Sequence, residues 1–408
     1  MHNTNQNIFS EKEFLNDCPD YKFIPMILPA TERIIAMGDI HGDLKLAIRS
    51  FKLANLIDDN LNWIANPPNT IVVQVGDQID SCRPIPNVYD CQKRKYPGDK
   101  AEDIDVINFF NKMNTLASKY GGAVYSLLGN HELMNSQGRF DYVSYENYYN
   151  FKYEDPNTKK IYEGPHGRQE AFKPGGPIAN LMACTRPSLL IIGSTMFVHA
   201  GILPVLATNL QYLNMDPEAS LRYLNLIVRK WLLNKLTEEQ RRDKKIFINN
   251  LRISPFWTRI YGSIPINTGL ESADCDLYVK RALEVYSIGK LVIGHTPQLF
   301  TNNDGINGTC YVKNNSGLDN KLYRIDGGFS RAFNIFNKNN NMVQVLEIIN
   351  DKIFNIITDE TLYKYISPPN ININKNQMDK ISSIYSQNRT PKRINTKHKK
   401  RNMRKLIY

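Results

Sequence analysis

Five short motifs place metal-ligating residue types directly after apolar, β-branched runs of the sequence, each in a turn that contains glycine. Glycine permits sharp turns that a Cβ would block, so a short polar side chain beside it can point back toward a shared centre. Four of the seven histidines fall in these turns, which ordinary turn chemistry does not explain. The pattern therefore predicts a metal site. The motifs are GDIHGD at 38–43, GDQID at 76–80, GNHE at 129–132, VHAG at 198–201 and GHT at 294–296.

The donors in these motifs are carboxylate, imidazole and amide groups, which suit Mn, Fe or Zn better than Ca. They are Asp39, His41, Asp77, Asn130, His199 and His295. Six ligands are too many for one metal with an open position but suffice for two metals that share a carboxylate, and Asp77 is the expected bridge. Two such ions, about 3.5–4 Å apart, activate a bound water and stabilise in-line displacement at phosphorus. We therefore expect phosphate esters to be hydrolysed by direct attack of a metal-bound water.

His131 stands next to a predicted ligand and is not needed as one. A histidine in this place can protonate the departing alkoxide or phenoxide, which otherwise leaves poorly. It needs a carboxylate to fix its tautomer and to stabilise its charge, and Asp80 is the candidate. We expect His131 to act as general acid with Asp80 as its partner.

The elements that must position these residues alternate along the chain. Helical spacing of apolar residues is seen at 44–56, 103–120 and 220–235. Alternation of buried strands with helices predicts an α/β fold, in which loops past the C-terminal ends of strands build ligand sites. The expected strands lie at 33–39, 70–77, 123–130, 188–201, 290–296, 321–328 and 342–349.

The sequence divides into three parts. We expect a polar lead-in at 1–31 and a catalytic domain at 32–358. Within the domain, the segment 136–187 is rich in Tyr, Gly, Pro and Asn and is expected to form a cap of mixed structure that lines a substrate cleft. The segment 367–408 is expected to be a disordered basic tail.

The basic charge of the chain belongs to this tail. The formal net charge is +11, but the last twenty residues contain nine Lys or Arg and no Asp or Glu, so residues 1–388 carry only +2. The tail is a candidate for electrostatic contact with nucleic acid. No apolar run is long enough to span a membrane and the N-terminus does not resemble a secretory signal, so we expect an intracellular protein of the cytoplasm or nucleus.

The six cysteines are scattered and include no CxxC pair. A chain of this size needs no disulfide framework, so reduced thiols are expected. Cys82 and Cys91 are the exception: they bracket a short loop beside a catalytic motif and are candidates for a reversible redox pair.

These motifs resemble those of the calcineurin-like metallophosphoesterases, in particular the phosphoprotein phosphatase branch and, within it, the Shewanella-like protein phosphatases. The resemblance covers residues 32–350 and rests on several further matches. They are GDIHGDL, GGAVYSLLGNHELMN, PGGP at 174–177, VHAGILP at 198–204, WTR at 257–259, VIGHTPQ at 292–298 and DGGFSRA at 326–332. The resemblance implies a sandwich of mixed β-sheets flanked by helices, with the active site at the C-terminal loops of the strands.

The resemblance also implies a role for each residue. Asp39 and His41 are assigned to the first metal and Asp77 to both. The second metal takes Asn130, His199 and His295, and His131 with Asp80 forms the general-acid pair. These implied roles agree with the reading of the residues themselves.

One departure concerns the phosphate. The family has Arg-Gly after the last Asp of the second motif, and that Arg binds the phosphate, but here the position is Ser81. Arg83, two places on, Arg259 in the WTR element and Arg331 are the candidates to replace it.

The resemblance implies a phosphoprotein substrate but leaves phospho-Ser/Thr and phospho-Tyr open. The Tyr-rich segment 142–153 could supply the aromatic wall of a phosphotyrosine pocket. One alternative is hydrolysis of a dinucleoside polyphosphate or another small molecule. A further alternative, a non-catalytic scaffold that binds nucleic acid through its tail, is disfavoured by the complete set of ligands.

Overall fold

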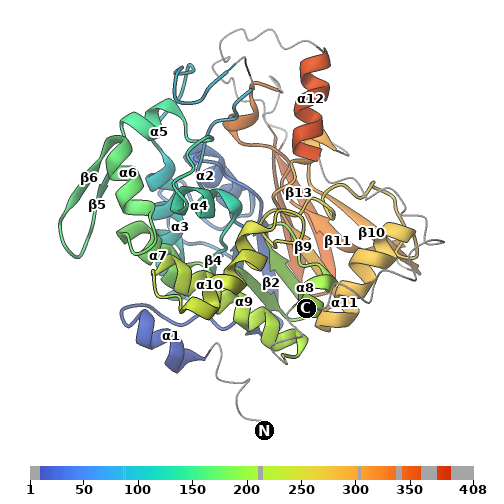
Figure 1. Cartoon of the computed structure of the whole chain (residues 1–408). Coiled ribbons are helices and arrows are strands. Elements are labelled where there is room, and N and C mark those ends of the chain that lie inside the picture. Colours follow the sequence, from blue (N-terminus) through green and yellow to red (C-terminus); the bar gives the residue numbers. More distant parts are fainter. Residues whose placement is uncertain are drawn as a thin grey trace, which may run out of the picture.

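Two β-sheets packed face to face form the centre of the molecule, with helices on both outer sides (Figure 1). The computed structural model describes residues 10–386 except 86, 88, 210–214, 302–304, 316, 337–341 and 360–374. The predicted α/β class, with mixed sheets flanked by helices, is confirmed.

The first sheet has five strands in the order β13-β12-β2-β3-β4. β2, β3 and β4 run parallel, whereas β12 pairs antiparallel with β2 and with β13. The parallel strands bring the ends of the first three predicted runs to one edge of the sheet. The bounds are β2 Arg33–Met37, β3 Ile71–Gln74, β4 Ala123–Ser126, β12 Val343–Ile349 and β13 Ile353–Asp359.

The second sheet has six strands in the order β1-β7-β8-β9-β11-β10. β8, β9 and β11 are parallel, and β7 and β10 join their neighbours β8 and β11 antiparallel. The predicted run at 188–201 is thus the β7–β8 hairpin rather than one strand. The bounds are β1 Ile27–Leu28, β7 Leu189–Ile192, β8 Thr195–Val198, β9 Lys290–Ile293, β10 Asn307–Asn314 and β11 Gly317–Arg324.

Alternate side chains of the second sheet enter two different cores. Leu190 and Ile192 pack with residues of the first sheet, such as Val73, in the core between the sheets. Leu189 and Ile191 point the other way, into the core that the second sheet forms with helices. Both faces of these strands are buried, which is why the sequence reads as continuous apolar runs and not as alternation.

Helices complete the layers. α2 and α3 contribute Leu46, Phe51 and Phe110 to the core of the first sheet, and Asp43 caps α2 by accepting a hydrogen bond from the backbone N–H of Leu46 at 3.0 Å. α7, α9 and α11 cover the outer face of the second sheet. The bounds are α2 Leu44–Leu53, α3 Asp103–Ser118, α4 Asn130–Ser136, α7 Pro177–Thr185, α8 Pro204–Asn209, α9 Pro217–Leu232, α10 Glu238–Lys244 and α11 Arg281–Tyr286. Two π-helices lie at Lys245–Asn249 and Cys275–Lys280, and two 3₁₀ helices at Gln298–Phe300 and Arg331–Phe333.

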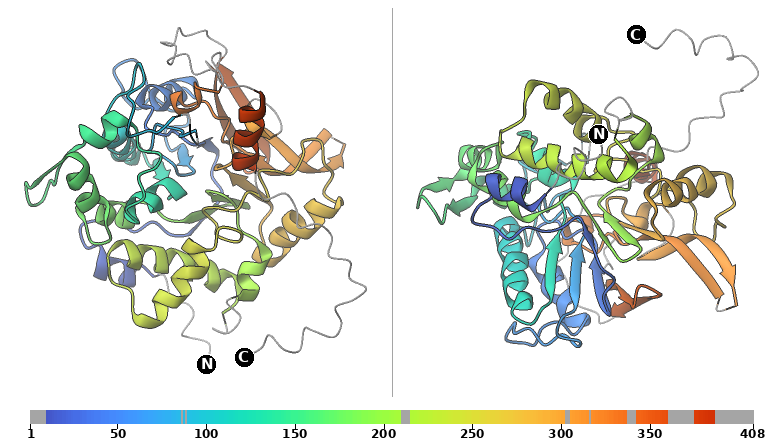
Figure 2. Two further views of the ribbon diagram at one scale, coloured as in Figure 1. Left: turned by 45° about the horizontal axis from the view of Figure 1, so that its top comes forward. Right: turned by 90° about the horizontal axis from the view of Figure 1, so that it is seen from below.

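The segment 136–187 contains both helices and strands. It forms α5 Tyr145–Tyr149, a hairpin of β5 Lys152–Glu154 and β6 Ile161–Glu163, and the helices α6 Gly164–Phe172 and α7. The two views of Figure 2 place this segment on the opposite side of the molecule from β10 and α11.

The lead-in and the tail both contain ordered elements. In the lead-in, α1 Glu11–Asp17 buries Phe14, and β1 joins the second sheet through β7. In the predicted disordered tail, α12 Lys375–Ser386 is a helix, so the expectation of disorder fails for these twelve residues. The basic residues from 389 onward lie outside the described residues.

The expectation of reduced thiols is wrong. All six cysteines form disulfides: Cys18–Cys184, Cys82–Cys91 and Cys275–Cys310. Partners 166 and 35 residues apart in the sequence meet only in the folded chain, and spacing alone could not reveal them. Disulfides persist chiefly in oxidising compartments, so the cysteines give no support to the intracellular expectation. Over the described part of the chain, no helix is long and apolar enough to cross a membrane.

Candidate dinuclear metal site

The eight predicted catalytic and metal-binding residues meet where strands of both sheets end. The first sheet supplies six positions, in the loops after β2 and β3 and at the start of α4, and the second sheet supplies two, one after β8 and one after β9. The first group is Asp39, His41, Asp77, Asn130 and His131, joined by Asp80 from the β3 loop, and the second is His199 and His295. All eight side chains are buried. We call the six predicted ligands Asp39, His41, Asp77, Asn130, His199 and His295 the metal cradle.

The backbone of the site is unusually strained. His41, Asp77, Asp80 and His295 all have positive φ angles, between 47° and 74°. Residues other than glycine rarely adopt this conformation, and it costs of order 1–3 kcal/mol at each position. The tight turns that this geometry creates aim four side chains inward from three different loops.

Two glycines allow the loops to approach one another. A Cβ on Gly129 would lie 2.2 Å from Oδ1 of Asp77, and one on Gly294 would lie 2.2 Å from Oδ1 of Asp39. Neither position can carry a larger residue without moving a carboxylate of the cradle.

Asp77 lies at the centre of the cradle. Its Oδ2 is 3.3 Å from Nε2 of His199 and 3.9 Å from Nε2 of His41. Two groups of ligand atoms within the described residues are close enough to hold a metal ion: His41 with Asp77 and His131, and His199 with Asp77 and His295. Asp77 belongs to both groups, as a bridging carboxylate must. Asp39 also faces this centre, with its Oδ2 3.7 Å from Nε2 of His41.

The three cradle histidines are held by backbone carbonyls on their outer side. Nδ1 of His41 lies 3.2 Å from the carbonyl of Ile79, and Nδ1 of His199 lies 2.8 Å from that of Val75. Nε2 of His295 lies 3.1 Å from the carbonyl of Trp257. A ring nitrogen that donates to a carbonyl leaves the opposite, inward nitrogen with a free lone pair, which is the tautomer that a metal requires.

The side-chain oxygen of Asn130 lies close to one ring nitrogen of His199 and one of His295. Oδ1 of Asn130 lies 2.9 Å from Nε2 of His199 and 2.7 Å from Nδ1 of His295. When each ring is neutral and donates to its carbonyl, neither of these nitrogens carries a proton, so three acceptor atoms face one another. A cation among them would turn mutual repulsion into ligation. The residues present therefore fit a divalent metal.

The pKa shifts of His41 and Asp39 also suit a bound divalent metal. Burial, assisted by nearby Arg83, lowers the pKa of His41 well below its ordinary value and keeps the ring neutral. Burial also raises the pKa of Asp39 well above its ordinary value, and the neighbouring carboxylates of Asp326 and Asp77 add to the shift. Oδ2 of Asp326 is buried and has no hydrogen-bond partner among the described residues. Three carboxyl groups this close call for positive charge between them.

The two residues predicted to form the acid pair are in contact. Nδ1 of His131 lies 2.7 Å from Oδ2 of Asp80, and its Nε2 lies 3.8 Å from Oδ2 of Asp77, so the ring bridges Asp80 and the cradle. Oδ1 of Asp80 accepts hydrogen bonds from Asn135 at 2.9 Å and from Arg168 at 3.3 Å. Asp80 is thus fixed on both oxygens.

Sequence reasoning missed the residues that support these groups. Arg168, on α6, is fully buried and donates to Asp80 and, at 2.8 Å, to Asp103. Glu132 accepts from the backbone N–H groups of Asp77 and Gly129, which ties two motif loops together. Glu132 stands inside the GNHE motif and could have been found there, but nothing in the sequence marks Arg168.

The three candidate arginines do not lie in the same place. Arg83 and Arg259 line the small pocket that opens on Asp77, Asn130 and His131. Arg331 does not line this pocket; it pairs with Glu102 at 2.6 Å and donates to the carbonyl of Gly42. Ser81, at the position of the usual Arg, is buried beside Gly42 and accepts a hydrogen bond from Nδ2 of Asn147 at 3.0 Å. Trp257, Phe333 and Tyr142 complete the walls of the pocket, and Tyr142 is the only residue of the Tyr-rich segment that lines it.

Comparison with known proteins places the chain in a family. Residues 32–299 match the family model of the calcineurin-like phosphoesterases. The chain is 62% identical over 253 residues to an uncharacterised protein, R398, of Acanthamoeba polyphaga mimivirus, covering 62% of this chain and 98% of the relative. It is 27% identical over 364 residues to Shewanella-like protein phosphatase 2 of Arabidopsis thaliana, covering 82% and 79% of the two chains.

A solved structure supports the fold. The cold-active protein-tyrosine phosphatase of a psychrophilic Shewanella species superposes with a TM-score of 0.51 at 17% identity, over 82% of this chain and 83% of that one. The predicted resemblance, the fold and the expectation of a phosphoric monoester hydrolase are confirmed. The chain belongs to the calcineurin-like phosphoesterase family.

Proposed function

We propose that this protein is a phosphoprotein phosphatase that uses two divalent metal ions, Mn, Fe or Zn, to hydrolyse phosphomonoesters by in-line attack of water. The observation that carries the proposal is the His131–Asp80 pair at 2.7 Å, whose imidazole opens on the same pocket as Asp77. A positioned acid beside a bridging carboxylate is what phosphomonoester cleavage requires.

Each part of the cradle has a task in this proposal. Asp39 and His41 would hold the first ion, Asn130, His199 and His295 would hold the second, and Asp77 would serve both. When bound, the two ions supply an activated water and neutralise charge on the phosphate. The carbonyls behind the histidines fix the rings, so no reorganisation is needed when the ester binds.

The arginines of the pocket orient the ester. Arg83, in the loop after β3, and Arg259, between the two π-helices, both line the pocket, and a guanidinium can bind two phosphate oxygens at once. Arg83 thereby takes the place of the family's usual arginine, with its guanidinium held above the Phe333 ring at 4.5 Å. Arg331 is left out of this role.

His131 then delivers the proton. As the ester bond to phosphorus breaks, Nε2 protonates the leaving oxygen while Asp80 accepts the hydrogen bond from Nδ1 and stabilises the imidazolium. Arg168 and Asn135 hold Asp80 in place from the other side.

The name of the Arabidopsis relative favours a protein substrate over a small molecule. The test is phosphate release by Mn²⁺-loaded protein from phosphothreonine and phosphotyrosine peptides and, with a coupled phosphatase, from a dinucleoside tetraphosphate. Asp77→Asn serves as the blank. Turnover of either peptide that disappears in the variant supports the proposal and ranks the two residues. Turnover of the nucleotide alone refutes the protein-phosphatase assignment and favours a small-molecule hydrolase.

A further inference from the structure

A second cavity, of about 230 Å³, adjoins the metal-site pocket and has no role in the reaction above. Three segments build it: the irregular loop 81–100 after β3, the start of α2, and residues 331–335 with their short 3₁₀ helix. Arg83 lines both the cavity and the metal-site pocket, so the two are neighbours. We call this cavity the basic pocket.

Cations predominate around the basic pocket. Four line it: Lys45, Arg83, Lys100 and Arg331. The acid that lines it, Asp43, is already engaged, since its two oxygens accept backbone N–H groups of Leu46 and Arg331. Glu102, outside the lining, offsets part of the charge by pairing with Arg331 and Lys100. A net positive field remains, which attracts a carboxylate or a phosphate.

Arg83 joins the basic pocket to the reaction centre. Its Nη1 donates to the carbonyls of Asp80 and Cys82 at 3.1 and 2.8 Å, and its guanidinium lies over Phe333 and Tyr142. Its Nε and Nη2 have no hydrogen-bond partner within the described parts of the chain. This side chain is thus fixed at one end and retains donors for an anion.

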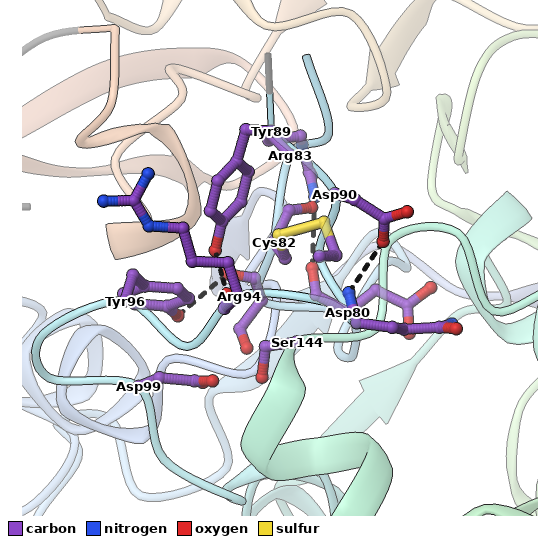
Figure 3. The surroundings of a disulfide bond; sticks show 12 residues. Asp80, Cys82, Arg83, Tyr89, Asp90, Arg94, Tyr96, Asp99 and Ser144 are labelled. Carbon is purple, nitrogen blue, oxygen red and sulfur yellow. Dashed lines mark hydrogen bonds between the residues drawn. A yellow bond between two sulfur atoms is a disulfide. The ribbon is translucent and has the colours of Figure 1, made fainter. Parts of the chain in front are cut away.

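The floor of the basic pocket is apolar. The Cys82–Cys91 disulfide packs there with Tyr89, Tyr96 and Ile335, and Figure 3 shows Arg83, Tyr89 and Tyr96 around the disulfide. The hydroxyls of Tyr89 and Tyr96 donate to the carbonyls of Arg94 and Ser81. The two tyrosines therefore offer ring surface rather than hydrogen bonds, and the cations of the lining supply the donors.

We infer that the basic pocket binds an acidic side chain of the substrate, a carboxylate or a second phosphate, close in sequence to the phosphorylated residue. The inference rests on the proposed function. The apolar floor suits the stem of such a side chain, and the cations of the lining suit its charged end. An extended peptide advances about 3.3–3.6 Å per residue, so a pocket adjoining the metal site is reached within about three residues.

The test uses phosphopeptides that differ at one position. An Ala, a Glu or a phosphoserine is placed in turn at each of the three positions on either side of the target residue, and kcat and KM are measured for each peptide. The wild-type protein should prefer Glu and phosphoserine over Ala by about 5- to 10-fold in KM at the productive position, since exposed charge pairs have modest strength. Whichever acidic residue gives the lower KM identifies the source of the anion.

The diagnostic variant is Lys45→Ala with Lys100→Ala, since both lysines are exposed and lie outside the metal cradle. It should abolish the preference while kcat and the turnover of p-nitrophenyl phosphate, which is too small to reach the basic pocket, stay within about 2-fold. The matched control is Lys52→Ala with Lys93→Ala, on the same helix and the same loop but outside the lining. The control variant should keep the preference for acidic peptides. In the wild-type protein, about 0.5 M salt should weaken this preference by screening the charges.

The outcomes separate two failures. If no phosphopeptide is turned over, the proposed function fails. If the peptides are turned over with equal KM, or if the control removes the preference as fully as the diagnostic variant, the proposed function stands and the inference about the basic pocket is refuted. A loss confined to the dinucleoside tetraphosphate would refute it as well, because the pocket would then serve a nucleotide.

Discussion

The metal cradle and the basic pocket are neighbours, but the chain builds them differently. The cradle takes buried side chains from loops at the ends of five strands in two sheets, and each histidine is held from behind by a backbone carbonyl. The basic pocket is formed largely by one irregular loop, in which a disulfide joins two cysteines nine residues apart. The side chain of Lys100, one of its cations, is 65% exposed. Precise chemistry is placed on rigid elements, and contact with variable partners is placed on a loop.

The two regions also use charge differently. At the cradle, the buried carboxyl groups of Asp39 and Asp77 lie close to that of neighbouring Asp326, which favours a cation among them. In the basic pocket, Lys45 and Lys100 are exposed, so water screens their charges and each contributes little. Damage to the cradle should therefore abolish turnover of every substrate, and damage to the pocket should change only the choice among substrates.

The largest effect on turnover is expected from a substitution of Asp77, the ligand predicted to serve both metal positions. Asp77→Asn replaces the carboxylate that serves both metal positions, and the loss of several kcal/mol of transition-state stabilisation should lower kcat/KM by about 1,000-fold or more for all substrates. Metal content, measured by atomic emission after desalting, should fall from two ions per chain. Two retained ions with normal turnover would show that the cradle is not the reaction centre.

His131→Asn distinguishes the general acid from a ligand, since His131 also lies in one of the groups able to hold a metal. An acid matters most when the leaving group is poor. Turnover of a phosphothreonine peptide should fall about 100-fold, but turnover of p-nitrophenyl phosphate only about 10-fold. Metal content should stay at two ions. Equal losses on both substrates together with lost metal would make His131 a ligand.

The metal cradle could be predicted from the sequence to a greater extent than the surroundings of the basic pocket. The positions of the cradle could be predicted because a ligand residue after a buried strand and a glycine turn is a local pattern. The six predicted ligands lie close together in the structure, Asp39 beside His41 and Asn130 beside His199 and His295. The α/β layers follow from apolar runs in the same way. The positive φ angles of His41 and Asp77 were not predictable, since tertiary contacts impose them.

Contacts between residues far apart in the sequence could not be predicted. Arg168 is 88 residues from Asp80, and Cys18 is 166 residues from Cys184. Neither pair has a local signal, because only the packing of α6 and α1 on the rest of the chain brings the partners together. The substitution at Ser81 was visible, but the choice of Arg83 over Arg331 depends on which loop faces the pocket.

Arg168→Met tests how far the cap supports the cradle. It removes a buried cation from Asp80 and Asp103, which should destabilise the fold by about 3–5 kcal/mol and lower kcat by about 10- to 50-fold, with metal content unchanged. Arg168→Lys keeps the charge and should recover part of both losses. An unchanged kcat in Arg168→Met would show that Asp80 needs no support from α6.

The same variant has a pH signature. Burial raises the pKa of Asp103 from 3.8 to about 6, although Arg168 opposes the shift. A carboxyl with a raised pKa contributes stability at low pH that is lost as the pH rises through its folded-state pKa. Without Arg168 that pKa should rise further, so the gap in Tm between wild type and variant should widen from pH 5 to pH 8. A gap that is constant with pH would contradict this linkage.

A smaller effect is expected from the disulfide under the basic pocket. Cys82→Ser with Cys91→Ser frees the loop, which must then be ordered when a peptide binds, and should lower kcat/KM for acidic phosphopeptides about 5-fold more than for p-nitrophenyl phosphate. Cys275→Ser with Cys310→Ser removes a disulfide that lines neither pocket and is the matched control. If both pairs of substitutions change the two substrates alike, the Cys82–Cys91 disulfide serves stability alone.

The smallest effect on turnover is expected from the basic tail, which belongs to neither region. Truncation after Ser386 removes all nine Lys and Arg of the last twenty residues, while the ligands of the cradle and the lining of the basic pocket lie before it. Phosphate release should therefore stay within about 2-fold for small and peptide substrates. Retention on a DNA column in about 0.1 M salt should be lost, because nine cations supply a strongly salt-dependent attraction to phosphates and residues 1–388 carry a net charge of only +2. If the truncated chain keeps its affinity for DNA, the contact comes from the folded body, where the basic pocket is the first place to look for it.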